Sequence, residues 1–300
     1  MSTGLRLYLD FVVFVFGAAI GSFLNVCIHR MPRGESIVNP PSHCPHCNAW
    51  IRWKDNIPLL SYVVLCGKCR HCGERINPRY VLVELLTALL FLGIWLKYPL
   101  SWLAPVYWVA VGGLIVGTFI DLEHYIIPDE ITIGGVVVGF VASILVPSLH
   151  GETFVFLSGF KSLLGILIGS ALVLWIAIFG ELIFRKEAMG FGDVKLTAAI
   201  GAFFGWQGAV FALAVSSVIG SIVGLLWIAL SRERRAVARE ISAKEISYNL
   251  DAWNIRDEMD AHAMRSSIPY GPFLALVAAS WIFVGEYVPM WYAPLLGLTN

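Results

Sequence analysis

Long apolar runs separated by short polar segments dominate the chain. Apolar runs of a length that can cross a bilayer lie at residues 7–28, 80–96, 101–120, 131–147, 160–184 and 268–292. A further run at 194–230 is too long for one crossing, because an α-helix rises about 1.5 Å per residue and the bilayer core is about 30 Å thick. We expect a break at Gly205-Trp206-Gln207-Gly208 to divide this run in two. The pattern therefore predicts an all-α polytopic membrane protein with about eight transmembrane helices.

The composition of the chain agrees with this fold class. Of its 300 residues, 58% are hydrophobic and 14% are charged, and the formal net charge is +0. Such values are typical of a polytopic protein in a lipid bilayer, and the absence of a basic bias predicts no nucleic-acid partner. The first run contains Asp10 and no small-residue cleavage site follows it, so we expect a retained helix rather than a signal peptide.

Lysine and arginine are concentrated on one side of the predicted arrangement. Segments 29–79, 185–195 and 231–267 contain eighteen of the 21 basic residues, and even numbers of predicted helices separate these segments. The positive-inside rule assigns such segments to the cytosol. The charge pattern thus predicts a multi-pass protein with both termini outside and its polar loops mainly in the cytosol.

The same pattern divides the chain into five regions. We expect the first transmembrane helix at 1–28, a cytosolic zinc-binding domain at 29–79 and transmembrane helices two to seven at 80–230. A charged cytosolic insertion is expected at 231–267, followed by the last transmembrane helix and the C-terminus at 268–300. The insertion contains both basic and acidic residues, and we interpret it as a solvated segment.

Two aspartates lie at the edges of apolar runs, where a carboxylate is costly and therefore a candidate for function. Asp121 follows the third predicted helix and Asp193 follows the fifth, so both lie on the cytosolic face and can meet. In such a pair, one ionised carboxylate takes a proton from water while the other, protonated, donates to a scissile carbonyl. Gly190 and Gly192 permit positive φ and the close approach of a substrate backbone. The alternative is that each aspartate is a helix cap or a loop residue.

Cysteines in segment 29–79 form two similar short motifs. Cys44-Pro45-His46-Cys47 and Cys69-Arg70-His71-Cys72 are paired Cys-x-x-Cys sequences, and four thiolates at such spacing suit a tetrahedral structural Zn²⁺. Cys66 also forms a Cys-x-x-Cys sequence with Cys69, so it is an alternative ligand. We prefer Cys44, Cys47, Cys69 and Cys72, because the second motif then mirrors the first. The remaining alternative is a set of free thiols without metal.

Glu84 is a further acidic residue within an apolar run. It lies about one turn inside the second predicted helix, near the cytosolic side. It is a candidate for recognising a substrate amine or for pairing with an arginine, and the alternative is a structural role in which its carboxylate reaches the interface.

Several of these segments together resemble a known protein family. Gly190-Phe191-Gly192-Asp193-Val194-Lys195-Leu196, with Asp121 and Ile127-Pro128-Asp129, is similar to the bacterial type IV prepilin leader peptidases, which are membrane aspartyl proteases of the Gly-X-Gly-Asp type. Gly21-Ser22-Phe23-Leu24-Asn25-Val26 with His29-Arg30-Met31-Pro32, and Pro269-Tyr270-Gly271-Pro272-Phe273-Leu274-Ala275, resemble the N-terminal and last-helix motifs of this family. The resemblance implies that Asp121 and Asp193 are catalytic and that Gly190, Gly192, Lys195, Pro128, Asp129 and Glu84 support them.

The resemblance also implies a substrate and a location. The expected activity is removal of the leader peptide from prepilins or pseudopilins at the cytosolic face of the bacterial inner membrane, with the type IV pilus or type II secretion machinery as an indirect partner. Many family members also methylate the new N-terminus with S-adenosylmethionine, an activity that the resemblance associates with the zinc-bearing loop. The sequence itself contains no recognisable nucleotide-binding motif.

Two other classes of protein fit parts of the pattern. A proton-coupled transporter also uses acidic residues in the membrane, although transporters tend to hold them near the midplane within inverted repeats. A zinc-dependent membrane binding module without catalysis would need only the cysteine-rich segment. Leader removal that depends on both aspartates separates the protease from these two alternatives.

Overall fold

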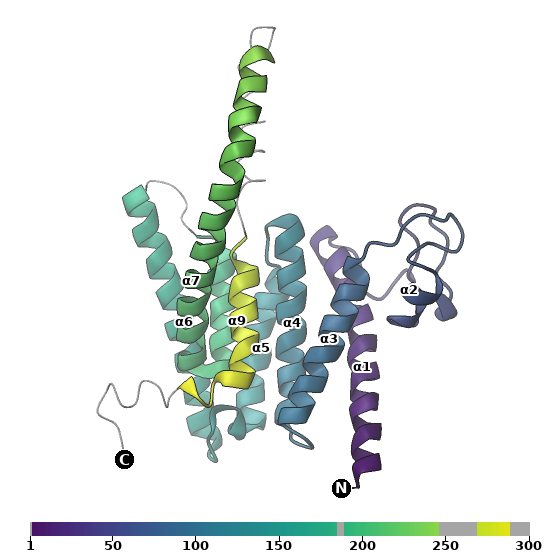
Figure 1. Cartoon of the computed structure of the whole chain (residues 1–300). Coiled ribbons are helices and arrows are strands. Elements are labelled where there is room, and N and C mark those ends of the chain that lie inside the picture. The colour runs from purple at the N-terminus through teal and green to yellow at the C-terminus, as the bar shows by residue number, and fades with distance from the viewer. Residues whose placement is uncertain (1, 185–188, 246–268, 289–300) are drawn as a thin grey trace.

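The computed structural model describes residues 2–184, 189–245 and 269–288, and within them every regular element is a helix (Figure 1). The long helices are α1 (Thr3–Arg30), α3 (Arg79–Lys97), α4 (Leu103–His124), α5 (Asp129–Leu145), α6 (Val155–Phe184), α7 (Phe191–Glu245) and α9 (Gly271–Val284). The short ones are α2 (Leu60–Val64), η1 (Met31–Arg33), η2 (Trp53–Asp55) and η3 (Pro147–His150). The predicted all-α class is therefore confirmed.

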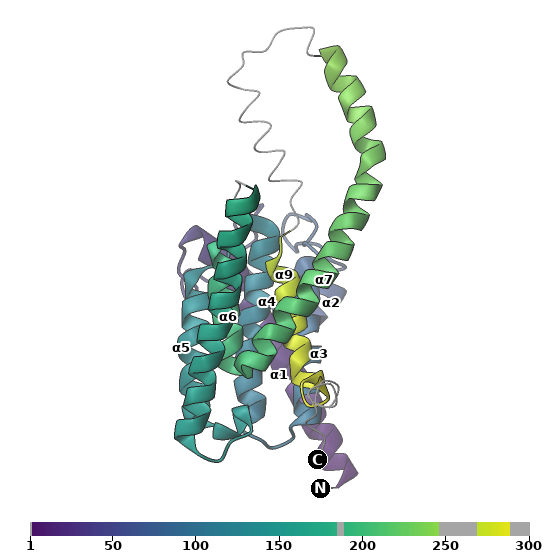
Figure 2. The same cartoon turned by 90° about the vertical axis from the view of Figure 1, so that its left-hand side faces the viewer.

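Five of these helices are long and apolar enough to cross a membrane, within the residues described. They are α1, α3, α4, α6 and the part of α7 up to Trp227, while α9 is apolar but shorter. These helices pack side by side in one bundle, as the two views show (Figures 1 and 2). The fold is that of a multi-pass membrane protein, and the count of eight crossings stays a prediction.

Helix α7 is broken at Gly205, within the segment where the sequence predicts a break. Gly205 has φ 70° and ψ 179°, which lie outside the helical region and in a part of conformational space open mainly to glycine. The chain reverses there, so the part of α7 before Gly205 runs along the bundle and the longer part after Gly205 returns beside it (Figure 2). The first residues of α7 follow α6 and lie at the same end of the bundle as the last residues of α4 (Figure 1).

Small residues bring two pairs of helices into close contact. A Cβ atom on Gly201 of α7 would lie 2.1 Å from the carbonyl oxygen of Gly165 in α6, so neither position tolerates a side chain. A Cβ on Gly21 of α1 would likewise lie 2.7 Å from the Cα of Glu84 in α3. Such contacts allow helix backbones to approach closely in a membrane. They fix α1 against α3 at the level of Glu84.

The region expected to be a charged insertion, 231–267, is described only in its first part. The backbone of α7 continues as a helix to Glu245 and extends past the end of the bundle (Figure 1). Residues 246–268 lie outside the described part of the chain, so the solvated character of this insertion stays a prediction.

Candidate functional site

Asp121 lies in the last turn of α4, where the helix meets two other parts of the chain. Its side chain is only 7% exposed, and its carboxylate accepts a hydrogen bond from the backbone N–H of Gly271, in the first turn of α9. A Cβ on residue 271 would lie 2.5 Å from Oδ2 of Asp121, so only glycine brings the N–H this close. The free N–H groups of a helix start are well suited to an anionic oxygen.

Asp193 lies in the first turn of α7 and faces Asp121. The two carboxylates are close enough for their charges to repel each other. The carboxylate of Asp193 also accepts a hydrogen bond from the backbone N–H of Gly190, while its own N–H donates to the Gly190 carbonyl at 3.1 Å. Asp193 is the third residue of α7, and a carboxylate at this position can reach back to the N–H of the N-cap residue, here Gly190. Asp193 therefore stabilises the start of α7 and also lies beside Asp121.

Ile127 packs between the end of α4 and the starts of α7 and α9. A Cβ on Gly192 would lie 3.5 Å from the Cβ of Ile127, and one on Gly271 would lie 3.2 Å from its Cδ1. The turn that carries Ile127 begins at Tyr125, which has a left-handed φ of 57°. The loop between α4 and α5 thus packs against the beginnings of α7 and α9, and it keeps the two aspartates at one end of the bundle.

The other predicted supporting residues lie on α5 and α7. Pro128 is the N-cap of α5, as expected for a residue that ends the preceding loop. Asp129 follows it in the first turn, and its Oδ1 lies 2.6 Å from the Nζ of Lys195. Lys195 therefore joins the start of α7 to the start of α5. Within the described residues its ion pair is with Asp129, not with either member of the aspartate pair.

Gly190 and Gly192 do not use the positive φ that glycine permits. Neither is among the described glycines with left-handed backbone, which are Gly34, Gly67, Gly73, Gly151 and Gly205. The reason is that Gly192 is inside the first turn of α7, and Gly190 caps it through an ordinary hydrogen bond. A Cβ on Gly190 would meet only ordinary contacts, the nearest at 3.6 Å from Oδ2 of Asp193. An alanine at this position would therefore meet no steric clash among the described residues.

The four cysteines chosen from the sequence form a cluster in the segment between α1 and α3. The Sγ atoms of Cys44, Cys47, Cys69 and Cys72 all lie within 4.8 Å of one another, and those of Cys44 and Cys72 are 3.9 Å apart. A tetrahedral zinc with Zn–S bonds of about 2.3 Å places its sulfur ligands roughly 3.8 Å apart. The donor set and its spacing therefore fit a zinc ion, and Cys66 is not part of the cluster.

The two cysteine motifs have the same backbone turn. The N–H of Asn48 donates to the Cys44 carbonyl, and the N–H of Gly73 donates to the Cys69 carbonyl, at 2.9 and 3.0 Å. Both donors have left-handed backbones, with φ 54° and 73°. Hydrogen bonds from the N–H groups of Cys72 and His71 lower the pKa of the Cys69 thiol to about 6. A thiolate is the form that binds metal, so the turn itself prepares Cys69 as a ligand.

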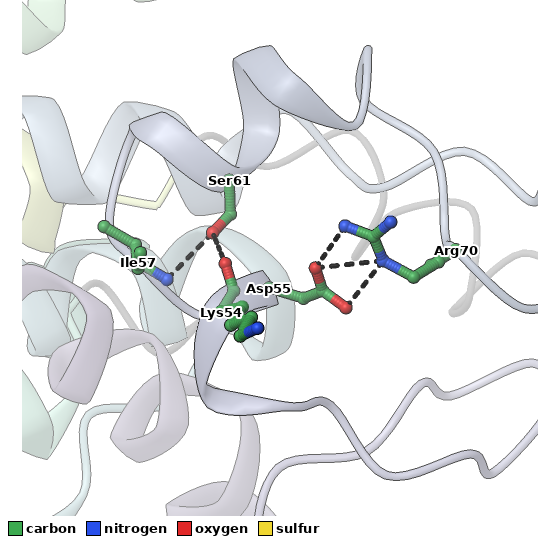
Figure 3. A network of polar contacts seen from close by, with 5 residues as sticks. All are labelled: Lys54, Asp55, Ile57, Ser61 and Arg70. Atoms are coloured by element: carbon green, nitrogen blue, oxygen red, sulfur yellow. Dashed lines mark hydrogen bonds and ion pairs between the residues drawn. The ribbon is translucent and has the colours of Figure 1, made fainter.

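An ion pair ties the second cysteine motif to η2 (Figure 3). Arg70 donates from Nε to Oδ2 of Asp55 at 2.9 Å and from its terminal nitrogen to Oδ1 at 2.6 Å. Ser61 at the start of α2 accepts from the N–H of Ile57 at 2.8 Å and donates to the carbonyl of Lys54 at 3.2 Å. Since no helix in residues 31–78 is longer than five residues, such side-chain bonds and the cysteine cluster hold the segment together.

Glu84 is buried between this segment and the helices. It is 9% exposed, accepts the N–H of Leu59 at 2.8 Å through Oε2, and accepts the hydroxyl of Ser22. Leu59 has a left-handed φ of 61°, which is uncommon for a branched residue. The structure does not bring Glu84 into the contacts that surround Asp121, so it belongs to a different environment from the aspartate pair.

Gly271, Ile127 and Asn25 lie within the motifs that resemble the family, but the sequence analysis assigned none of them a role in the site. The signal for Gly271 was present in the pair Gly271-Pro272, because proline in the first turn marks a helix start with free N–H groups. Asn25, beside Glu84 on α1, is 2% exposed and lies in an apolar run where it would not be expected without a function. Ile127 stands out in the sequence only as the first residue of the Ile127-Pro128-Asp129 motif.

The fold and these residues define a class of protein: a multi-pass helical membrane protein with two neighbouring aspartates and a four-cysteine cluster at the same end of its bundle. Two family models match the chain. The bacterial peptidase A24 N-terminal domain matches residues 15–98, and the type IV leader peptidase family matches residues 108–225.

Curated relatives match nearly the whole chain. The prepilin leader peptidase/N-methyltransferase of Aeromonas hydrophila is 35% identical over 94% of this chain and 92% of its own length. Proteins of the same name from Pseudomonas aeruginosa and Legionella pneumophila are 30% and 31% identical, and cover 94% and 95% of this chain. The chain therefore belongs to the type IV leader peptidase family. No solved structure matches it.

Proposed function

We propose that this protein removes the leader peptide of type IV prepilins or pseudopilins and then methylates the new N-terminus. The observation that supports this most directly is the convergence of Asp121 and Asp193 at one end of the bundle. The family relationship gives the substrate class, because the relatives are named prepilin leader peptidase/N-methyltransferase. Acids held at one end, not at the midplane, favour this function over a transporter.

The chemistry of peptide cleavage follows from two neighbouring carboxyl groups. Because like charges at short distance disfavour double ionisation, the pair holds one proton between them. The ionised member takes a proton from a water molecule, which attacks the scissile carbonyl, and the protonated member donates to the carbonyl oxygen. The N–H of Gly271 stabilises negative charge on Asp121 through this cycle.

The substrate backbone would reach the pair across Gly190 and Gly192. A Cβ at Gly190 would contact the Asp193 carboxylate at 3.6 Å, so a side chain there would lie between the substrate and Asp193, while Lys195 and Asp129 fix the starts of α7 and α5. Pro128 ends the loop that carries Ile127 against Gly192 and Gly271. An apolar substrate helix would lie in the bilayer beside the bundle, and its basic leader would remain in the polar phase at this end.

The proposed location is the bacterial inner membrane, with eight crossings and the aspartates at the cytosolic face. The concentration of lysine and arginine in 29–79, 185–195 and 231–267 supports this orientation. In that compartment thiols are reduced, so the four cysteines are metal ligands rather than disulfides. A zinc ion would cross-link the two cysteine turns, and S-adenosylmethionine would supply the methyl group. The pilus and type II secretion machinery are partners only through the processed substrates.

The test is processing of a prepilin by the full-length protein in proteoliposomes. Asp121→Asn and Asp193→Asn should each lower the rate of leader removal by about 10³-fold or more, because each removes one of the two proton-transfer groups. Mass spectrometry of the processed protein reports the cleavage position and the methyl group together.

The matched control is Asp10→Asn, which changes an aspartate on α1 that accepts a hydrogen bond from Trp95 at 2.9 Å. This variant should process at the wild-type rate. Normal processing by either Asp121→Asn or Asp193→Asn would exclude the two-aspartate mechanism.

A further inference from the structure

A cavity of about 540 Å³ lies between the cysteine-containing segment and the adjoining ends of α1 and α3. Asn25 from α1 and Glu84 from α3 are among its lining residues, as are Cys44 and Cys69 from the cysteine cluster. This volume is within the range of small-molecule and peptide-terminus sites. Asp121 and Asp193 do not line the cavity, so it is a separate compartment from the aspartate pair.

The carboxylate of Glu84 lies in this cavity without a cation. Glu84 is 9% exposed, and none of the ion pairs among the described residues includes it. Two arginines on the same wall are already engaged: Arg30 donates to the carbonyls of Ser36 and Pro40, and Arg79 pairs with Glu123. Buried carboxylates are almost always paired. The two hydrogen bonds from Leu59 and Ser22 leave acceptor capacity on its oxygens.

Asn25 provides a second, independent sign of a missing donor. Its side chain is 2% exposed, and its amide nitrogen donates to the Tyr80 carbonyl at 2.9 Å. Its Oδ1 has no hydrogen-bond partner among the described residues, although it is buried. An unpartnered buried acceptor costs free energy, so its presence on a cavity wall indicates a donor that arrives with a ligand.

We propose that this cavity binds the new α-amine of the cleaved substrate, with Glu84 and Asn25 Oδ1 as its acceptors. A protonated amine has three N–H donors and one positive charge, which match a buried carboxylate without a cation and a free amide oxygen. The inference rests on the proposed function, which requires a place where the amine is held for methylation. It makes the amine site distinct from the aspartate pair that releases the amine.

Transfer of a methyl group to the bound ammonium requires a group that first receives a proton, and Glu84 is that group. The bound ammonium passes one proton to the Glu84 carboxylate and becomes a neutral amine. The nitrogen lone pair then forms a bond to the methyl carbon as the carbon–sulfur bond of a sulfonium donor breaks, and the donor leaves as a neutral thioether. The product is a methylated ammonium, and Glu84 returns its proton to water.

The competing explanation is that Glu84 only holds Leu59 in its left-handed conformation. A glutamine at this position keeps an oxygen that accepts the Leu59 N–H, but it removes the negative charge. Glu84→Gln therefore preserves the structural hydrogen bond and removes the ionic recognition of the amine. Glu84→Asp keeps the charge with a shorter side chain, and it serves as the conservative variant.

The experiment measures binding of a mature pilin peptide to the full-length, zinc-loaded protein in detergent, without a methyl donor. The same peptide with an acetylated N-terminus is the reference. Wild type should prefer the free amine by at least about tenfold, since hydrogen bonds to charged groups are strong in a buried site. Glu84→Gln should reduce the preference to about twofold or less, and Glu84→Asp should restore part of it.

Glu152→Gln is the matched control, because Glu152 follows η3 and pairs with Lys161, away from the cavity. It should keep the full preference. An undiminished preference in Glu84→Gln with unchanged zinc content would overturn the inference, as would a wild type that does not distinguish the two peptides. If Glu84→Gln loses its zinc, a preference above about twofold in Glu84→Asp supports the inference, and a preference of about twofold or less in that variant contradicts it. A wild type that neither cleaves nor methylates would refute the proposed function, whatever this binding assay shows.

Discussion

The surroundings of Asp121 are made by the ends of long helices, whereas the four-cysteine cluster is made by two short turns in a segment with only small helices. Around Asp121, the positions of α4, α7 and α9 depend on the packing of the whole bundle. In the cysteine cluster, each turn is closed by its own backbone hydrogen bond. The first region is therefore built by distant parts of the chain, and the second by two local turns whose cysteines could share a metal ion. Changes in one should leave the other largely intact.

The largest effect is expected on the zinc content of the protein when one of the four cysteines is replaced. Cys72→Ser removes one of four thiolates, and structural zinc sites contribute about 10–16 kcal/mol of apparent binding free energy. We expect the zinc content to fall from about one ion per chain to near zero, as measured on the purified protein by atomic spectroscopy. Segment 29–79 should then become sensitive to protease.

Cys66→Ser is the control for this variant, since Cys66 lies near the cluster but outside it. It should retain its zinc. The two regions are independent if leader removal by Cys72→Ser falls much less than methylation does. An equal loss of both activities would show that the aspartate pair depends on the cysteine segment.

The next largest effect is expected on the rate of leader removal by Gly271→Ala. An alanine there would place its Cβ 2.5 Å from Oδ2 of Asp121, so the helix start or the carboxylate must move. A displacement of this kind can lower a reaction rate by about 10²-fold, and we expect leader removal to fall by that order. Zinc content should not change.

Gly134→Ala is the matched control for Gly271→Ala, because a Cβ at Gly134 of α5 meets nothing within 4 Å. It should process at the wild-type rate. Wild-type processing by Gly271→Ala would mean that the close contact between α9 and Asp121 is not needed for activity.

The smallest effect is expected from Asp55→Asn, which breaks the ion pair with Arg70. Exposed pairs contribute little, so we expect zinc release to a chelator to be faster by roughly two- to fivefold. The hydrogen bond from Arg70 lowers the pKa of Asp55, so the pair is present above the usual pKa of an aspartate and is lost only as the pH falls below that range. The difference from wild type should therefore stay constant between about pH 6 and pH 8.

Asp129→Asn makes the same chemical change in the other region, where it breaks the pair with Lys195. It should leave zinc release unchanged. A faster release in Asp129→Asn would contradict the separation of the two regions.

Sequence patterns were sufficient where the structure depends on local chemistry. The apolar run at 80–96 gave α3 (Arg79–Lys97) to within one residue at each end, because side-chain polarity changes sharply there. The break at Gly205 followed from the length of the run and from glycine. The cysteine cluster followed from spacing, since two identical turns hold their thiols in similar geometry.

The sequence was not sufficient where residues far apart in the chain meet. The hydrogen bond from Gly271 to Asp121 and the one from Leu59 to Glu84 depend on how helices and loops pack, and no local pattern encodes them. Nor does the sequence tell that Gly190 and Gly192 have ordinary backbone angles, which they have because Asp193 caps the turn that they form. The orphan oxygen of Asn25 is visible only when its neighbours are known.

The order of helices along the chain has a consequence for synthesis. The N–H that contacts Asp121 comes from Gly271, at the start of the last helix described. During translation, the nascent chain has therefore inserted most of its helices before that donor emerges from the ribosome. A product truncated before α9 lacks this neighbour of Asp121, so we expect the two aspartates to reach their final surroundings only when synthesis of the chain is nearly complete.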